Sequence, residues 1–284
     1  MKLFEILSTL TEGGMAIKGV SPITQKEVNE YSPDLLDKIC KELKLSKLKV
    51  KMIGSAGNKL KPTDLSGDID IAVECSSELV EKHISKLAGD NQFKIMKGIG
   101  VYSFAYNVDK KLVQVDLMPV NNINFATWSF QAHINDLADG LKGAHRNEIF
   151  FAIASNMPRK VLKTDEEGNP VIIERYFYDL SRGLMIGTQS RINNKGKITK
   201  NFSTVEKKVL SDDPNKIVKL MFGDHVNYRD VETFDSTLRA ILYDYFIHKE
   251  EIENILNQTT KGIKNKNLEI PLESKYKIKR RLNS

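Results

Sequence analysis

The spacing of apolar positions changes from helical to strand-like within the first half of the chain. A helix is predicted over residues 32–43, where Ser32 serves as N-cap, Pro33 occupies the first turn and apolar side chains follow at intervals of three and four. A second helix is predicted over residues 76–87. Strands are predicted where the interval becomes two, over residues 48–54, 68–74, 93–108 and 111–118.

The second half of the chain has longer helical patterns and two turn signals. Two small hairpins are predicted where glycine-containing turns, around Gly168 and Gly196, separate segments rich in Val, Ile and Tyr. The predicted fold class is therefore α/β (α+β), with a mixed, largely antiparallel sheet followed by a mostly helical second domain. Its helices are predicted over residues 128–140, 145–156, 212–222 and 231–257.

Length and composition fit two soluble globular domains, since the 284 residues are 40% hydrophobic and 28% charged. We place the boundary between domain 1–125 and domain 126–284. The first domain starts with an amphipathic segment at residues 4–10. No apolar run approaches the roughly 18 residues of a membrane span, and the first ten residues do not resemble a secretion signal. Two cysteines, Cys40 and Cys75, are too few for a disulfide scaffold. We expect a cytoplasmic protein without a membrane partner.

The positive charge of the chain is concentrated at its C-terminal end. Residues 261–284 hold eight basic and two acidic residues, so this segment accounts for the whole formal net charge of +6. A cationic segment on a neutral body favours a polyanionic partner such as RNA, because each Lys or Arg near a phosphate releases condensed counterions. The alternative interpretation is a solvated tail that aids solubility.

Three aspartates are predicted to project from strand faces. Asp68 and Asp70 lie two residues apart, so that their side chains share a face, and Asp116 lies on a later strand. Carboxylates gathered on one face repel one another unless a cation binds them. Two Mg²⁺ or Mn²⁺ ions about 3.5–4 Å apart are typical of enzymes that transfer phosphoryl groups. The alternative is an acidic stripe that faces solvent.

A glycine-serine loop precedes the first two aspartates. Gly54 and Ser55 follow a predicted strand, where a glycine lets backbone N–H groups approach a triphosphate and the serine hydroxyl adds a donor. Lys59, later in this loop, either neutralises phosphate charge or is solvated. The loop therefore favours phosphate binding beside the aspartates.

These residues together carry a family resemblance over about residues 30–120. Gly54-Ser55, the run Ser66-Gly67-Asp68-Ile69-Asp70-Ile71-Ala72-Val73 and the run Val113-Gln114-Val115-Asp116-Leu117 resemble the palm of the DNA polymerase β-like nucleotidyltransferase superfamily. The resemblance implies a palm that transfers a nucleotidyl group from a nucleoside triphosphate (NTP) to a hydroxyl, with release of pyrophosphate. It implies that Asp68 and Asp70 hold both metal ions, and that Asp116 holds the catalytic ion and helps to deprotonate the acceptor. Gly54 and Ser55 would bind the phosphates.

A second similarity concerns the helix predicted over residues 145–156. Its start, His145-Arg146-Asn147, is similar to the arginine-arginine-aspartate helix start of bacterial tRNA nucleotidyltransferases and poly(A) polymerases. There it contacts the sugar and phosphates of the incoming nucleotide, which implies nucleotide binding by Arg146 and Asn147. His145 and Asn147 replace the other arginine and the aspartate. The alternative is a surface arginine at a helix start. The resemblance favours an RNA 3′ end, such as that of tRNA, as the acceptor.

Two further functions could use the same residues. One is nucleotidyl transfer to a protein or a small molecule, including synthesis of a second messenger. The other is a catalytically inactive palm that binds nucleic acid. The three aspartates disfavour an inactive palm, because a pure binder has no need to direct three negative charges at phosphate. The basic segment 261–284 discriminates between the acceptors, because only an RNA acceptor would depend on it and on salt.

Overall fold

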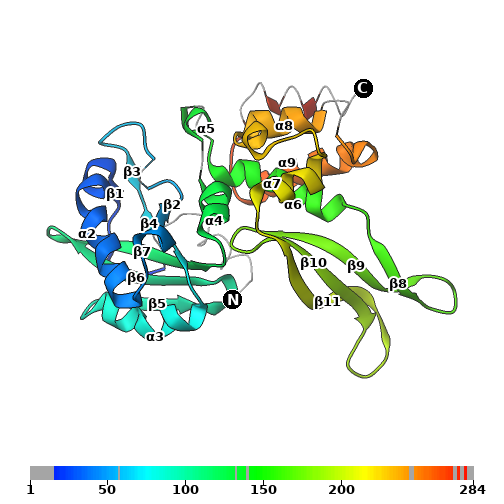
Figure 1. The fold of residues 1–284 in the computed structure, drawn as a ribbon, viewed down its shortest axis with the longest axis horizontal. Coiled ribbons are helices and arrows are strands. Elements are labelled where there is room, and N and C mark those ends of the chain that lie inside the picture. Colours follow the sequence, from blue (N-terminus) through cyan, green and yellow to red (C-terminus); the bar gives the residue numbers. More distant parts are fainter. Residues whose placement is uncertain are drawn as a thin grey trace. The chain divides into compact units, whose positions relative to one another are not determined.

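The chain folds into two compact units, residues 1–143 and 144–284, in a computed structural model (Figure 1). The amphipathic segment predicted at residues 4–10 lies outside the described residues. No helix in the part of the chain that the structure describes is both long and apolar enough to cross a membrane. The structure describes residues 16–56, 58–131, 133–138, 141–242, 246–270, 274–275 and 278–279.

The first unit is built on a five-stranded sheet in the order β2-β4-β7-β6-β5. Only the central pair, β4 with β7, is parallel, and the other pairs are antiparallel. The predicted mixed, largely antiparallel sheet is therefore confirmed. The strands are β2 (Val50–Ile53), β4 (Asp68–Glu74), β5 (Phe93–Met96), β6 (Val101–Val108) and β7 (Lys111–Val120). Short 3-10 turns precede β2 and β6, at η1 (Lys47–Lys49) and η2 (Lys97–Ile99).

The two faces of this sheet bury different sets of side chains. Ile69, Ile71 and Val73 of β4 are fully buried in a core shared with α2 (Gln25–Leu43) and α3 (Ser77–Ala88). The intervening side chains of β4 point to the opposite face, where Ala72 joins a smaller apolar cluster with α4 (Ile123–Phe130). The aspartates of β4 lie on this second face, toward the beginning of the strand.

Helix α2 begins earlier than the spacing of apolar residues predicts. Thr24 is its N-cap: the Thr24 hydroxyl accepts a hydrogen bond from the Glu27 backbone N–H (3.2 Å), and the Glu27 carboxylate accepts one from the Thr24 backbone N–H (2.8 Å). This capping box starts the helix at Gln25, directly after the short strand β1 (Ile23–Thr24), so the prediction of Ser32 as N-cap is wrong. Pro33 lies inside the helix.

The division between the units falls later than the predicted residue 125/126. Helix α4 packs on β2 and β4 and so belongs to the first unit, which extends to residue 143. The single helix predicted over residues 128–140 is also wrong. The structure has α4, capped at its start by the Asn122 side chain, and a separate short helix α5 (Ile134–Ala138).

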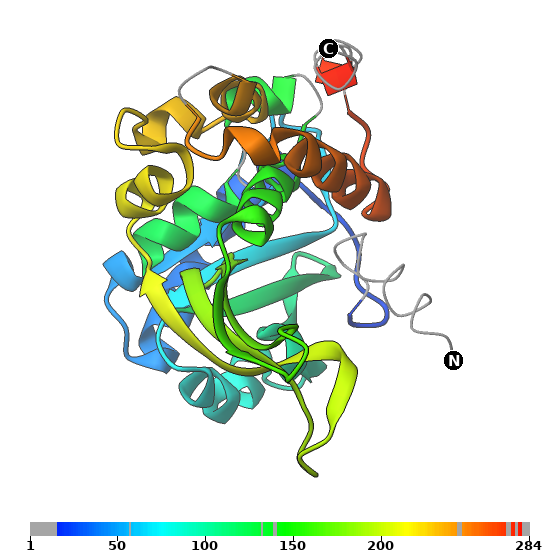
Figure 2. The same ribbon diagram turned by 90° about the vertical axis from the view of Figure 1, so that its right-hand side faces the viewer.

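The second unit contains more strand than predicted. In place of two small hairpins, four strands form one antiparallel sheet in the order β11-β10-β9-β8. Register shifts interrupt the β10–β11 and β8–β9 pairs, and such bulges bend strands, as Figure 2 shows for this sheet. The strands are β8 (Lys160–Thr164), β9 (Pro170–Asp179), β10 (Gly183–Ile192) and β11 (Ile198–Ser211).

Helices before and after this sheet complete the second unit. The long helix predicted over residues 231–257 is wrong, because the described residues 246–248 are not helical and a 3-10 turn follows them before the next helix begins. The helical elements are α6 (Gly143–Asn156), α7 (Pro214–Phe222), η3 (Tyr228–Val231), α8 (Phe234–Leu242), η4 (Lys249–Glu251) and α9 (Ile252–Asn265).

Candidate metal centre

The parallel pairing of β4 with β7 brings the three predicted aspartates together. Asp70 lies directly beside Asp116 in the register, and Asp68 lies two positions earlier, beside Gln114. Each aspartate offers a carboxylate oxygen, and the three oxygens lie within 4.8 Å of one another. Asp68 and Asp116 are buried, and Asp70 is half-buried. Three hard oxygen donors therefore converge at one point on the sheet.

Burial and mutual repulsion shift the pKa values of two of these aspartates. Burial, followed by the neighbouring charges of Asp68 and Asp116, raises the pKa of Asp70 well above its usual range. Burial also raises the pKa of Asp116, although hydrogen bonds to its carboxylate offset part of the rise. A divalent cation would remove the repulsion between the carboxylates, and an all-oxygen set of this kind fits Mg²⁺ or Mn²⁺.

Gln114 holds Asp116 in place, which the sequence patterns did not reveal. Its Nε2 donates to both carboxylate oxygens of Asp116, at 3.0 and 3.1 Å. Its Oε1 accepts from the backbone N–H of Ile17 at 3.1 Å, so the amide is fixed at both ends and fully enclosed. The only sequence signal was a polar residue two positions before Asp116, on the same strand face. Gln114 thus orients the third carboxylate.

Gly54 is required by its close approach to Asp70. It directly follows β2, whose last residue, Ile53, pairs with Asp70, and it has a φ of +71°. A Cβ atom there would overlap Oδ2 of Asp70 and lie 3.1 Å from its carboxyl carbon. The loop continues with Ser55, whose carbonyl accepts from the Asn58 backbone N–H at 3.4 Å. The backbone of this loop therefore runs against the cluster, as a phosphate-binding loop requires.

The rest of this loop is tied to the start of helix α2. β1 (Ile23–Thr24) pairs with β3 (Leu65–Ser66), and the Gln25 backbone N–H donates to the Asp64 carbonyl at 2.9 Å. The Gln25 side chain accepts from the Lys59 backbone N–H, also at 2.9 Å. Lys59 is half-buried on the same loop as Gly54 and Ser55. These bonds fix the backbone that carries the lysine, and its contact with a phosphate stays a prediction.

Arg146 and Asn147 lie in the second unit, near the start of α6. Both side chains are buried, contrary to the alternative of a surface arginine. The Arg146 guanidinium donates from Nη1 to the Glu232 carbonyl at 2.9 Å, and the neighbouring His145 ring contacts the Glu269 carbonyl at 3.0 Å. These contacts give the helix start a structural role, and nucleotide binding there stays a prediction.

The basic segment 261–284 is partly folded. Its first residues complete α9, and Ile263, Ile270 and Ile278 are buried. Lys266 pairs with Glu148 at 2.6 Å, so this lysine stabilises the second unit. Lys277, Arg280 and Arg281 lie outside the described residues. The basic segment is therefore not a wholly solvated tail.

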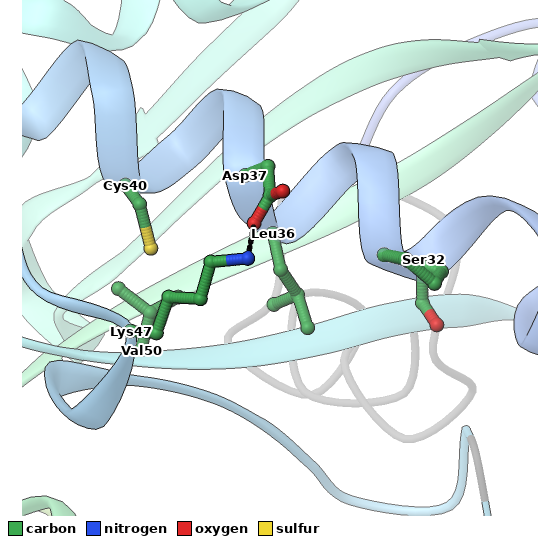
Figure 3. Close-up of a pocket in the computed structure, with 7 residues that line it drawn as sticks. Ser32, Leu36, Asp37, Cys40, Lys47 and Val50 are labelled. Atoms are coloured by element: carbon green, nitrogen blue, oxygen red, sulfur yellow. Dashed lines mark ion pairs between the residues drawn. The ribbon is translucent and has the colours of Figure 1, made fainter.

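A small pocket elsewhere in the first unit does not contribute to the cluster (Figure 3). It lies between α2 and the start of β2, with Leu36, Cys40 and Val50 among its lining residues. An ion pair of 2.6 Å joins Asp37 to Lys47 beside it. Val50 begins β2, whereas Gly54 follows the end of that strand, so the pocket and the carboxylate cluster lie at opposite ends of β2.

The sequence matches no protein-family model and no curated protein. The geometry of the three aspartates, Gly54 and Gln114 is therefore the basis on which a function can be proposed.

Proposed function

We propose that this protein is a metal-dependent nucleotidyltransferase that transfers a nucleotidyl group from an NTP to an acceptor hydroxyl and releases pyrophosphate. The observation that carries the proposal is the convergence of Asp68, Asp70 and Asp116 on the paired strands β4 and β7, with carboxylate oxygens within 4.8 Å of one another. The family resemblance of the sequence around these residues gives the same reaction.

The three aspartates would hold the metal ions. The raised pKa of Asp70 supports this, because burial and the neighbouring charges of Asp68 and Asp116 disfavour its ionised form and a bound cation would favour it. When bound, Mg²⁺ or Mn²⁺ supplies charge neutralisation for the phosphates and acidifies the acceptor hydroxyl. A cluster of three carboxylates therefore suits a phosphate-bearing substrate, because the same metal ions can bind both the carboxylates and the phosphates.

The other residues of the site act on position and charge. Gln114 holds the Asp116 carboxylate so that this side chain can accept the proton of the acceptor hydroxyl. Gly54 keeps the space beside Asp70 open, and the Ser55 hydroxyl and Lys59 ammonium would bind the triphosphate. We assign Arg146 and Asn147 to nucleotide binding only through the second resemblance.

The acceptor proposed first is an RNA 3′ end, such as that of tRNA. The basic segment 261–284 supports it, because exposed lysines such as Lys261 and Lys264 attract a polyanion. Transfer to a protein or a small molecule, including second-messenger synthesis, uses the same carboxylates without that segment. An inactive nucleic-acid-binding palm would use the segment without the carboxylates.

The experiment is a transfer assay with the purified full chain. Each NTP, labelled at the α-phosphorus, is incubated with Mg²⁺ and with bulk tRNA, single-stranded DNA or no acceptor. We expect labelled RNA from the wild type, and a loss of about 10³-fold or more with Asp70→Asn. Asp90→Asn removes the same charge from an exposed turn and is the matched control, which should keep full activity.

Three outcomes contradict the proposal in different ways. An amount of labelled product that Asp70→Asn leaves unchanged would contradict the assignment of the metal site. Label in a small molecule alone would contradict RNA as the acceptor and would support nucleotidyl transfer. No labelled product under any NTP and acceptor, with folded protein that binds RNA, would favour the inactive palm.

A further inference from the structure

The sheet of the second unit carries a row of positive charge on one face. Arg175 of β9 pairs with Gly187 of β10, which in turn pairs with Lys207 of β11. On the other side of β9, Lys160 pairs with Glu174, so the preceding residue, Arg159, comes beside Arg175. Three cations and one glycine therefore follow one line across four neighbouring segments of chain.

Contacts with Phe177 place these side chains on the same face. The Arg175 guanidinium carbon lies 5.1 Å from the centre of the Phe177 ring, and the Lys207 ammonium lies 4.2 Å from it. The ring also covers Gly187, where a Cβ would come within 2.9 Å of the ring edge. The opposite face packs on α6, because Tyr178, the next residue along β9, stacks on the Phe150 ring at 5.2 Å.

Among the residues that the structure describes, no acidic side chain balances the charge of this row. Among the described residues, no carboxylate lies within 4.0 Å of the charged nitrogens of Arg159, Arg175 or Lys207. The acids next to them in sequence, Glu174 and Glu206, alternate to the other face. Like charges at neighbouring positions of a sheet are unfavourable, and the charge of Arg159 adds to burial in lowering the pKa of Arg175.

A bound anion would relieve this repulsion. Arg159 and Lys207 are exposed, and Arg175 is half-buried with its Nε enclosed and without a hydrogen-bond partner among the described residues. Neighbouring strands are about 4.8 Å apart, so the row is roughly 14 Å long from Arg159 to Lys207. A row of this length suits an extended chain of negative charges better than a single small anion.

We propose that Arg159, Arg175 and Lys207 bind the phosphate backbone of a single-stranded nucleic acid. The half-buried Phe177 ring between the cations favours a single strand, because such strands combine phosphate contacts with stacking on aromatic rings. This site goes beyond the proposed nucleotidyl transfer. It does not use the aspartate cluster, and it is separate from the basic segment 261–284.

The test measures the binding of a fluorescein-labelled 12-nucleotide single strand, as RNA and as DNA, by fluorescence anisotropy at several salt concentrations. Three phosphate contacts predict a slope of log K against log salt of about −2. The double variant Arg159→Gln/Lys207→Gln removes two of them, so we expect binding about 25-fold weaker in 0.1 M salt and a slope reduced by about 1.4.

A matched control is available one residue along each strand. Lys160 and Lys208 are also exposed, but their side chains alternate to the other face, so Lys160→Gln/Lys208→Gln changes the net charge equally. We expect this control to change binding less than twofold. Circular dichroism checks that both double variants are folded, and all four substitutions are at exposed positions.

Several results would overturn the proposal. Equal weakening by both double variants would indicate attraction by net charge alone. Tighter binding of a DNA duplex or of poly-glutamate than of the single strand would identify a different partner, and no binding at low salt would remove the site. Binding is measured without NTP or Mg²⁺, and both double variants keep all three aspartates, so a failure of the proposed catalysis is distinguishable from a failure of this site.

Discussion

Replacing Asp70 by Asn should stabilise the metal-free protein while it destroys the metal site. Two unit charges 4.8 Å apart repel by about 3 kcal/mol at an effective dielectric constant of about 20. Because the crowded carboxyls already take up protons, we expect the folded state to gain a part of this, about 1–3 kcal/mol. For a chain of 284 residues, with an unfolding entropy of about 2.1 cal/mol/K per residue, that gain corresponds to a rise in Tm of about 2–5 °C.

The assay is thermal unfolding followed by circular dichroism, first in EDTA and then in Mg²⁺. In EDTA, Asp70→Asn should unfold at a higher temperature than the wild type, and Asp90→Asn should match the wild type. In Mg²⁺ the wild type should gain stability, because the ion binds only the folded state, and the variant should gain less. An Asp70→Asn protein that is less stable than the wild type in EDTA would refute the account of repulsion.

The difference in stability between the wild type and Asp70→Asn should depend on pH. The pKa of Asp70 is raised in the folded state, so the folded protein holds this proton more tightly than the unfolded chain does. The wild type therefore loses stability relative to Asp70→Asn as the pH rises from about 4, the unfolded pKa, through the raised folded pKa. The difference in unfolding free energy should grow over that range and then level off.

Three other substitutions test separate parts of the site. Gly54→Ala should weaken Mg²⁺ binding at least tenfold by calorimetry, because its Cβ displaces Asp70, whereas Gly100→Ala, with a φ of +67° and open space around it, should bind normally. Gln114→Met should cost about 1–3 kcal/mol of stability and shift the pH profile of Mg²⁺ binding upward, because the pKa of Asp116 loses the lowering effect of two hydrogen bonds; an unshifted profile would contradict that role. Neutralising exposed lysines of the basic segment should weaken transfer to RNA in a salt-dependent way and leave transfer to a small molecule unchanged. These lysines are Lys261, Lys264, Lys275 and Lys279.

Alternation along single strands made much of the site predictable. The two-residue period of β4 places Asp68 and Asp70 on one face, opposite the buried Ile69 and Ile71. Which strand lies beside β4 could not be derived in this way, because the parallel pairing with β7 joins segments about 46 residues apart, and its register depends on the whole core. The role of Gln114 could not be predicted for the same reason, since its partner Ile17 is 97 residues away in the sequence.

The start of α2 carries two competing local signals, and the capping box is the stronger one. Thr24-Gln25-Lys26-Glu27 has the spacing of a capping box, yet the proline at position 33 suggested a later helix start. In the second unit, the turns at Gly168 and Gly196 were placed correctly, but pattern alone could not show that both hairpins join into one sheet. The cationic row across that sheet depends on this register and was therefore not predictable.

The most direct test of nucleotidyl transfer compares ATP labelled at the α-phosphorus with ATP labelled at the γ-phosphorus, in Mg²⁺ and with the acceptor found in the screen. The account predicts that α-label enters the acceptor, that γ-label leaves as pyrophosphate, and that both events stop in EDTA or with Asp70→Asn. Entry of γ-label into the acceptor, or transfer of α-label that persists in EDTA, would contradict it.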